Sequence, residues 1–282
     1  MTIYSPPPVV PLKHALTIAT SDSGAGAGIQ ADLKTFAAHK VYGLSVLSAV
    51  TAQNTTAVTA LECLTPAVVT AQLQAIYDDI PVESIKIGLL GNAENTEAVA
   101  GFLAAKFPRT PLVVDPVMVS TSGHTFLPPD AVEALKKLMA QATLITPNIP
   151  EASTLWGRPI TGPEEQLAAG RALLATGAKN VLVKGGHGQA PGADDLLVGQ
   201  DGEIWFRGPR INTPNTHGTG CTLSSAICAN LALGLPLKEA VGLAKDYVAE
   251  GLRRSINLGH GPGPLNHFHE FYHFAPTPGE ES

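Results

Sequence analysis

The sequence of 282 residues contains only three cysteines, Cys63, Cys221 and Cys228, and no two of them form a Cys-x-x-Cys pair. Three isolated cysteines cannot build a complete disulfide framework and fit a reducing compartment, so we expect a cytoplasmic protein. Blocks of basic residues are absent and the net charge is −6, which argues against binding to nucleic acid. No apolar run approaches the ~20 residues of a membrane-spanning helix, so we expect no contact with a membrane.

Two common nucleotide-binding motifs are also missing. No Gly-x-x-x-x-Gly-Lys-Ser/Thr sequence occurs, which excludes a P-loop. The glycines of residues 24–28 are spaced Gly-x-Gly-x-Gly instead of Gly-x-Gly-x-x-Gly. In addition, no acidic residue follows a second strand about 20 residues later. The sequence therefore disfavours a Rossmann dinucleotide site.

Hydrophobic residues make up 44% of the chain, enough for a sizeable core. Short apolar segments alternate with segments of helix length, which is typical of β-α-β units around a mainly parallel sheet. The expected strands are residues 15–20, 44–51, 84–90, 112–114, 144–146 and 181–184, with an antiparallel hairpin at 195–198 and 203–206. The expected helices are residues 29–39, 67–79, 96–106, 131–139, 164–176, 219–233 and 237–258. We therefore predict a doubly wound α/β fold with helices on both faces of the sheet.

The chain contains no linker long enough to divide it into two domains. We expect one domain over residues 14–274. A proline-rich extension, residues 1–13, precedes it, and a flexible tail, residues 275–282, follows it.

Polar side chains follow the strands of this predicted sheet. They are Asp22, Gln53, Asp115, Asn148 and Lys184. In open α/β sheets, ligands bind beyond the carboxyl ends of the strands. We therefore expect these side chains to gather around one site.

The sequence His217-Gly218-Thr219-Gly220-Cys221 stands at the start of an apolar helix. Two glycines allow a tight turn, and the unpaired N–H groups of the helix start favour an anion. The same field lowers the pKa of a cysteine, so Cys221 could accept a proton. An anion site beside a potential base suggests phosphoryl transfer. The alternative is that the glycines only form a turn and that Cys221 is a small core residue.

These features are accompanied by further motifs in a fixed order. They are Ser-Asp-Ser-Gly-Ala-Gly-Ala-Gly-Ile-Gln-Ala-Asp-Leu-Lys-Thr at 21–35, Thr-Ala-Gln-Asn-Thr at 51–55, Val-Asp-Pro-Val-Met at 114–118, Ile-Thr-Pro-Asn at 145–148 with Glu151, Val-Lys-Gly-Gly-His at 183–187 and Asn-Thr-His-Gly-Thr-Gly-Cys at 215–221. Together they resemble the hydroxymethylpyrimidine kinase / phosphomethylpyrimidine kinase family of thiamine biosynthesis, which has the ribokinase-like fold. The resemblance runs from about His14 to about His269. The chain departs from the family at Thr20, where a glycine is usual, and at residues 23–25, where Pro-Ser-Gly is more common.

The resemblance implies roles for individual residues. The substrate-binding residues it implies are Asp32, Thr51, Gln53 and Lys245, and Leu89 and Val117 could supply apolar faces for a ring. The nucleotide-binding residues are Asn148, Lys184 and Thr219, the metal-binding residues are Asp115 and Glu151, and the catalytic residues are Gly218, Thr219, Gly220 and Cys221.

Several of these residues also have ordinary structural interpretations. Asp32 could be a carboxylate in the first turn of a helix, and Lys245 could lie on a solvated helix face. The spacing of Asn148 and Glu151 is that of a helix N-cap with its capping-box partner, which is compatible with a ligand role.

As a function, the resemblance implies phosphorylation of 4-amino-5-hydroxymethyl-2-methylpyrimidine and of its monophosphate by ATP and Mg²⁺, in a homodimer. Two alternatives stay open: a pyridoxal kinase of the same fold, and a non-catalytic pyrimidine-binding module. The presence of Asp115, Lys184 and Cys221 disfavours the second, because a retired site need not keep phosphate chemistry.

Overall fold

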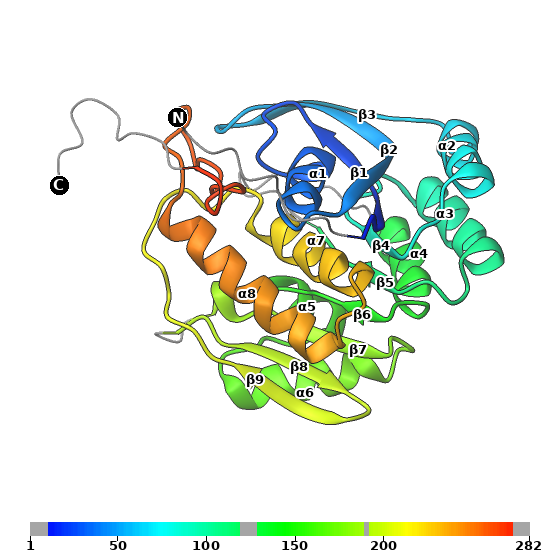
Figure 1. Ribbon diagram of the computed structural model, residues 1–282. Helices are drawn as coiled ribbons and strands as arrows, with labels where there is room; N and C mark the ends of the chain where they lie inside the picture. Colours follow the sequence, from blue (N-terminus) through cyan, green and yellow to red (C-terminus); the bar gives the residue numbers. More distant parts are fainter. Residues whose placement is uncertain (1–10, 119–128, 189–191, 273–282) are drawn as a thin grey trace, which may run out of the picture.

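A computed structural model describes residues 11–118, 129–188 and 192–272. Residues 1–10 of the expected N-terminal extension and the whole expected tail, 275–282, lie outside these ranges. The described residues form one nine-stranded sheet in the order β3-β2-β1-β4-β5-β6-β7-β8-β9 (Figure 1). The strands are β1 (His14–Asp22), β2 (Tyr42–Gln53), β3 (Val58–Cys63), β4 (Ser84–Ile87), β5 (Leu112–Val114), β6 (Leu144–Ile145), β7 (Asn180–Val183), β8 (Asp195–Gly199) and β9 (Gly202–Phe206).

Strands β1, β2, β4, β5, β6 and β7 pair in parallel, and β3, β8 and β9 are antiparallel to their neighbours. Both faces of the sheet are covered by helices (Figure 1). Helices α1 (Gly28–Ala38), α7 (Thr219–Ala232) and α8 (Leu237–Arg253) lie on one face. The opposite face carries α2 (Pro66–Asp79), α3 (Ala93–Lys106), α4 (Pro129–Met139), α5 (Ile149–Trp156) and α6 (Pro163–Leu174). The predicted doubly wound α/β fold and its antiparallel hairpin, β8–β9, are confirmed.

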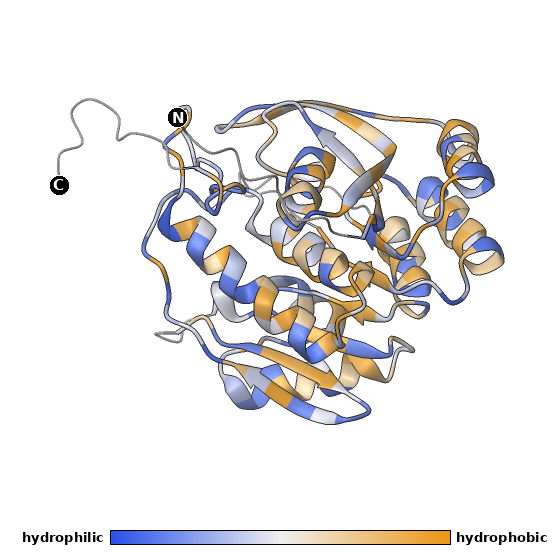
Figure 2. Ribbon diagram, viewed as in Figure 1, coloured by the Kyte–Doolittle hydropathy of each residue, from blue (hydrophilic) through white to orange (hydrophobic). Residues whose placement is uncertain are grey.

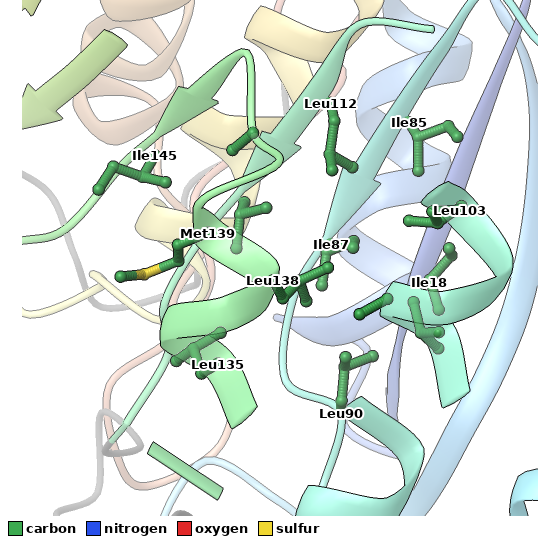
Figure 3. Packing of buried hydrophobic residues seen from close by; sticks show 14 of the residues in the cluster. Ile18, Ile85, Ile87, Leu90, Leu103, Leu112, Leu135, Leu138, Met139 and Ile145 are labelled. Atoms are coloured by element: carbon green, nitrogen blue, oxygen red, sulfur yellow. The ribbon is translucent and has the colours of Figure 1, made fainter. Parts of the chain in front are cut away.

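The central strands are buried on both sides because helices cover both of their faces. Figure 3 shows Ile18 of β1 and Ile85 and Ile87 of β4 beside Leu103 of α3 and Leu138 of α4. None of these five side chains is more than 3% exposed. Burying an aliphatic side chain of this size contributes about 1.5–3 kcal/mol. This core fixes the strands whose carboxyl ends carry the polar residues.

Strand β3 was not predicted from the sequence. Each of its residues is half-buried or exposed, and it lies at the edge of the sheet, where it pairs only with β2. It therefore lacks the continuous apolar run that marks the buried strands. The pairing of Ala49 with Cys63 and of Thr51 with Leu61 is decided by the tertiary fold.

Helix α8 ends at Arg253, earlier than the predicted end at residue 258. Along this helix hydrophobic and hydrophilic residues alternate, as a helix that covers a sheet with one side requires (Figure 2). Beyond it, the N–H of Ile256 donates to the carbonyl of Pro264 and not to a helical acceptor. Apolar residues after Arg253 extended the sequence pattern but not the helix. Within the described residues, no helix is both long and apolar enough to span a membrane.

The order of the strands reverses beside β1. The chain passes from β1 to β2 on one side and returns to β4 on the other. Loops that leave these strands in opposite directions open a crevice at their carboxyl ends, which is where open α/β sheets bind ligands.

A buried ion pair ties the sheet to two helices on one face. Lys86 Nζ of β4 lies 2.9 and 2.8 Å from the two carboxylate oxygens of Asp32 in α1, and both residues are fully buried. The hydroxyls of Thr17 in β1 and Ser225 in α7 each donate to Asp32 at 2.6 Å. Burial alone would lower the pKa of Lys86, but the Asp32 carboxylate holds this pKa above its ordinary value. Lys86 therefore stays charged.

Replacing Lys86 tests this link. The change Lys86→Met leaves the Asp32 carboxylate buried without its cation, so we expect a loss of about 3–5 kcal/mol in the free energy of unfolding. The double variant Lys86→Met, Asp32→Leu should recover much of this loss, because it removes both charges. Urea denaturation measures both effects. As a control, Lys136→Met removes an exposed pair with Glu133 and should cost less than about 1 kcal/mol. A similarly small loss in Lys86→Met would contradict this interpretation.

Candidate active site

A cavity of about 1190 Å³ lies at the carboxyl ends of the strands. Its volume exceeds the ~300–1,000 Å³ of a typical small-molecule site, so it has room for two ligands. The expected site residues that line it are Thr51, Gln53, Leu89, Asp115, Val117, Asn148, Glu151, Lys184, Gly218, Thr219, Gly220, Cys221 and Lys245. The fold thus brings together residues that lie far apart in the sequence.

The floor of the cavity includes the start of helix α7. Gly218 caps this helix in the left-handed conformation, with φ +77°. A β-carbon on Gly218 would lie 1.8 Å from the carbonyl oxygen of Gly26, so only glycine fits between the two loops. Both donors of Thr219 already bond to the carbonyl of Thr216. The first-turn amides of Gly220 and Cys221 have no acceptor within the helix and are the groups suited to an anion.

An ion pair between Lys184 and Asp115 lies next to the start of α7. Lys184 Nζ donates to Asp115 Oδ1 at 2.8 Å, and Thr146 donates to the same oxygen at 2.9 Å. A β-carbon on Gly220 would lie 3.2 Å from Lys184 Nζ and 3.4 Å from Asp115 Oδ2. The backbone of α7, the lysine and the carboxylate therefore meet at one point. Burial alone would lower the pKa of Lys184, but Asp115 and Glu151 hold it above its ordinary value, so Lys184 is a fixed cation.

Asn148 and Glu151 form the predicted capping box at the start of α5. The Glu151 amide donates to the Asn148 side chain at 2.9 Å, and the Asn148 amide donates to the Glu151 carboxylate at 2.8 Å. Burial, and to a lesser degree the Asp115 carboxylate, raise the pKa of Glu151 to about 7 against the attraction of Lys184. The box leaves both residues on the cavity wall, so the cap and a ligand role are compatible.

The predicted low pKa of Cys221 is wrong. Burial raises the pKa of this thiol to about 11, and the nearby Asp32 and Asp115 carboxylates also raise it. Lys86 and the amide of Gly28 act in the opposite direction but do not reverse the shift. At neutral pH, Cys221 therefore presents a thiol to the cavity and not a ready-made base.

The structure also corrects the expected place of Asp32. Asp32 is not on the cavity wall, because its carboxylate is fully buried and bound by the network with Lys86. Lys245 lines the cavity, but its ammonium group bonds to Asp195 of β8 at 2.7 Å. Strand β8 lies near the opposite end of the sheet from β2, which carries Gln53.

Gln53 and Thr51 lie at the end of β2, and Leu89 and Val117 also line the cavity. Amide and hydroxyl groups together with aliphatic side chains suit a flat heteroaromatic ligand, which needs both hydrogen bonds and apolar contact.

Sequence reasoning missed the pair of Asp22 and His217. The Asp22 carboxylate accepts hydrogen bonds from three loop amides, Gly24, Gly26 and Ala27, and from His217 Nε2 at 2.9 Å. Burial alone would raise the pKa of Asp22, but the bonds from His217 and the loop amides hold it below its ordinary value. Each of the two residues lies next to a glycine loop, and this position was the only hint of a role in the site. Their contact with each other could not be predicted, because they are 195 positions apart in the sequence.

The raised pKa of Cys221 predicts slow alkylation. In a Cys63→Ser background, the rate with iodoacetamide should still be rising between about pH 9 and about pH 10, because the thiolate is the nucleophile. An ordinary cysteine, with a pKa of about 8.5, should level off in this range. N-acetylcysteine serves as the reference, and the Cys63→Ser, Cys221→Ser double variant measures the contribution of Cys228. A plateau below about pH 8 would mean that the thiolate is stabilised after all.

Comparison with known proteins matches residues 22–266 to the family model for phosphomethylpyrimidine kinase. The hydroxymethylpyrimidine/phosphomethylpyrimidine kinase of Rhizobium meliloti (strain 1021) is 48% identical over 262 residues, which cover 92% of this chain and 98% of that protein.

Solved structures agree with this match. The crystal structure of phosphomethylpyrimidine kinase from Clostridium difficile 630 has a TM-score of 0.76 and 44% identity, and the match covers 84% of this chain and 98% of that one. The ADP complex of Bacillus subtilis pyridoxal kinase has a TM-score of 0.85 and 36% identity, covering 91% and 98%. The chain belongs to the phosphomethylpyrimidine kinase family.

Proposed function

We propose that the protein transfers the γ-phosphoryl group of ATP to 4-amino-5-hydroxymethyl-2-methylpyrimidine and then to its monophosphate, in thiamine biosynthesis. The observation that carries this proposal is the meeting of the α7 start, Lys184 and Asp115 inside a cavity that also holds Gln53. An anion site and a heteroaromatic site in one cavity are what a kinase of a small aromatic alcohol needs. Family membership supports the same reaction.

In the proposed reaction, the substrate oxygen forms a new bond to the γ-phosphorus, the bond between this phosphorus and the bridging oxygen of ADP breaks, and the proton of the substrate hydroxyl leaves to water. Charge develops on the transferring oxygens, and the amides of Gly220 and Cys221 together with Lys184 lie where they can stabilise it. Because phosphoryl transfer has a loose transition state, positioning and charge matter more than a strong base. A neutral Cys221 is compatible with this chemistry.

The carboxylates of the cavity fit Mg²⁺ bound together with a nucleotide. Mg²⁺ usually takes one or two carboxylates and completes its shell with phosphate oxygens and water. Within the described part of the chain, no cluster of three or more His, Cys, Asp or Glu side chains could hold a metal by itself. Asp115 and Glu151 are the residues that would hold the ion, which would neutralise charge on the phosphates.

Pyridoxal phosphorylation is the second candidate. The pyridoxal kinase of Bacillus subtilis shares the backbone at a TM-score of 0.85, so the fold alone does not separate the two substrates. Sequence identity favours the pyrimidine, at 48% for the Rhizobium enzyme against 36% for the pyridoxal kinase. A non-catalytic module is disfavoured by the buried Lys184–Asp115 pair, whose desolvation is costly unless charge serves a purpose. We keep the cytoplasmic location and the homodimer as predictions.

A side-by-side product assay tests the substrate. With ATP and Mg²⁺, the pyrimidine alcohol and its monophosphate should each give higher kcat/KM than pyridoxal, because the cavity combines Gln53 with apolar walls. The measurement is chromatographic detection of each phosphorylated product. A higher kcat/KM for pyridoxal would replace the main proposal with the second candidate.

The variant Lys184→Gln tests the anion site. It removes one preorganised charge, so we expect a loss of about 2–4 kcal/mol in transition-state stabilisation, measured from kcat/KM. The rise in melting temperature caused by ATP and Mg²⁺ should also become smaller. The matched control is Lys179→Gln. This lysine is exposed and directly precedes β7, the strand that Lys184 follows, so the variant should keep both kcat/KM and the ATP-induced shift. Unchanged kcat/KM and an unchanged ATP-induced shift in Lys184→Gln would remove this residue from the site.

A further inference from the structure

The side-chain amide of Gln53 lies between two groups that decide its orientation. Its Nε2 atom is 3.4 Å from His217 Nε2, and its Oε1 atom is 3.3 Å from Thr51 Oγ1. The oxygen and nitrogen of an amide have nearly the same size, so hydrogen bonding must decide which of them points each way.

His217 Nε2 must carry a hydrogen. It lies 2.9 Å from Asp22 Oδ2, an oxygen that also accepts from the amides of Gly26 and Ala27. These donors, with burial opposing them, keep the pKa of Asp22 low, so the carboxylate is ionised and can only accept. Whether the imidazole is neutral or protonated, its Nε2 is a donor. An amide nitrogen of Gln53 beside it would place two donors face to face.

Thr51 faces the other end of the Gln53 amide with an acceptor instead of a donor. Its single hydroxyl hydrogen is directed to the carbonyl of Ser21 at 2.9 Å, and this carbonyl can only accept. Thr51 Oγ1 therefore turns a lone pair toward Gln53, where an amide oxygen would place two acceptors face to face. Rotating the Gln53 amide by half a turn removes both conflicts: its oxygen then faces the donor edge of His217, and its NH₂ group can donate to Thr51 Oγ1.

We infer that Asp22 and His217 hold the Gln53 side chain with its oxygen toward His217 and its NH₂ group toward Thr51 and the cavity. One N–H then donates to Thr51, and the second is left for a ligand. The site thereby selects a ligand that presents a hydrogen-bond acceptor at this point, such as a ring nitrogen. Asp22 and His217 act as positioning residues through Gln53.

The surrounding loops make this arrangement rigid. A β-carbon on Gly26 would lie 2.2 Å from His217 Cδ2, so the imidazole rests directly on the first glycine loop. The backbone of Gln53 is held by Ser23, whose hydroxyl accepts from the backbone N–H of Gln53 at 2.8 Å. The His217 ring and the Gln53 backbone are therefore both held in place. Only the side-chain amide of Gln53 can rotate to match its neighbours.

Nuclear Overhauser effects test the orientation directly. With ¹⁵N-labelled glutamine, the Gln53 side-chain amide protons should contact the γ-methyl group of Thr51 more strongly than the ring protons of His217. Gln72 is the internal reference, because its amide accepts from and donates to the backbone of Leu47 and so has a known orientation. In His217→Phe, the preference of the Gln53 amide should weaken, because only Thr51 still favours one orientation, while the Gln72 pattern stays. Stronger contacts of the Gln53 amide protons to His217 in the wild type would overturn the inference.

Binding of analogues tests the ligand part, which rests on the proposed function. In calorimetry without ATP, we compare the pyrimidine alcohol with two pyridine analogues, each lacking one ring nitrogen. The analogue that lacks the ring nitrogen facing Gln53 should bind the wild type about tenfold more weakly, which is the cost of one lost hydrogen bond. In Gln53→Glu, which has no N–H to offer, that analogue should bind at least as well as the pyrimidine.

The two experiments fail in different ways. If the pyrimidine alcohol does not bind the wild type, the proposed function is wrong, and the Overhauser effects still decide the orientation of Gln53. If the alcohol binds and neither analogue is discriminated against, the inferred donor role of Gln53 is wrong.

Discussion

Helix α7 is held at the sheet by one buried carboxylate that four elements share. Asp32 of α1 binds Lys86 of β4, Thr17 of β1 and Ser225 of α7, all of which are fully buried. An ionised carboxylate in the interior must be satisfied in one geometry, since any displacement leaves it without partners. This requirement ties α7 to the sheet at Ser225, and the apolar packing of the same helix completes its placement with its start facing the cavity.

The chemistry of the cavity depends on charged groups that the fold holds close together and largely buried. The positive end of α7 and Lys184 meet the carboxylates of Asp115 and Glu151 in a partly dry space. Each charge shifts the ionisation of its neighbours: Lys184 stays a cation, whereas the thiol of Cys221 stays neutral. The site is therefore organised to receive phosphate charge and does not depend on a deprotonated cysteine.

Features with a local cause could be predicted from the sequence. The capping box of Asn148 and Glu151 follows from two residues three positions apart, and buried strands such as β5 and β7 follow from short apolar runs. The gathering of Gln53, Asp115 and Lys184 at one edge follows from the parallel sheet, because the carboxyl ends of its strands share that edge. The edge strand β3 has no such signature, since an edge position leaves half of its residues exposed.

The sequence by itself determined the fold class, the family motifs and the candidate site residues, all of which except Asp32 line the cavity, because these depend on periodicity and on short spacings. Only the tertiary structure decided how charged groups are paired. It placed Asp32 in the core, paired Lys245 with Asp195 of β8, raised the pKa of Cys221 and joined Asp22 to His217. Burial and electrostatic pairing depend on distances in space, and residues 195 positions apart carry no sign of their contact in the order of the chain.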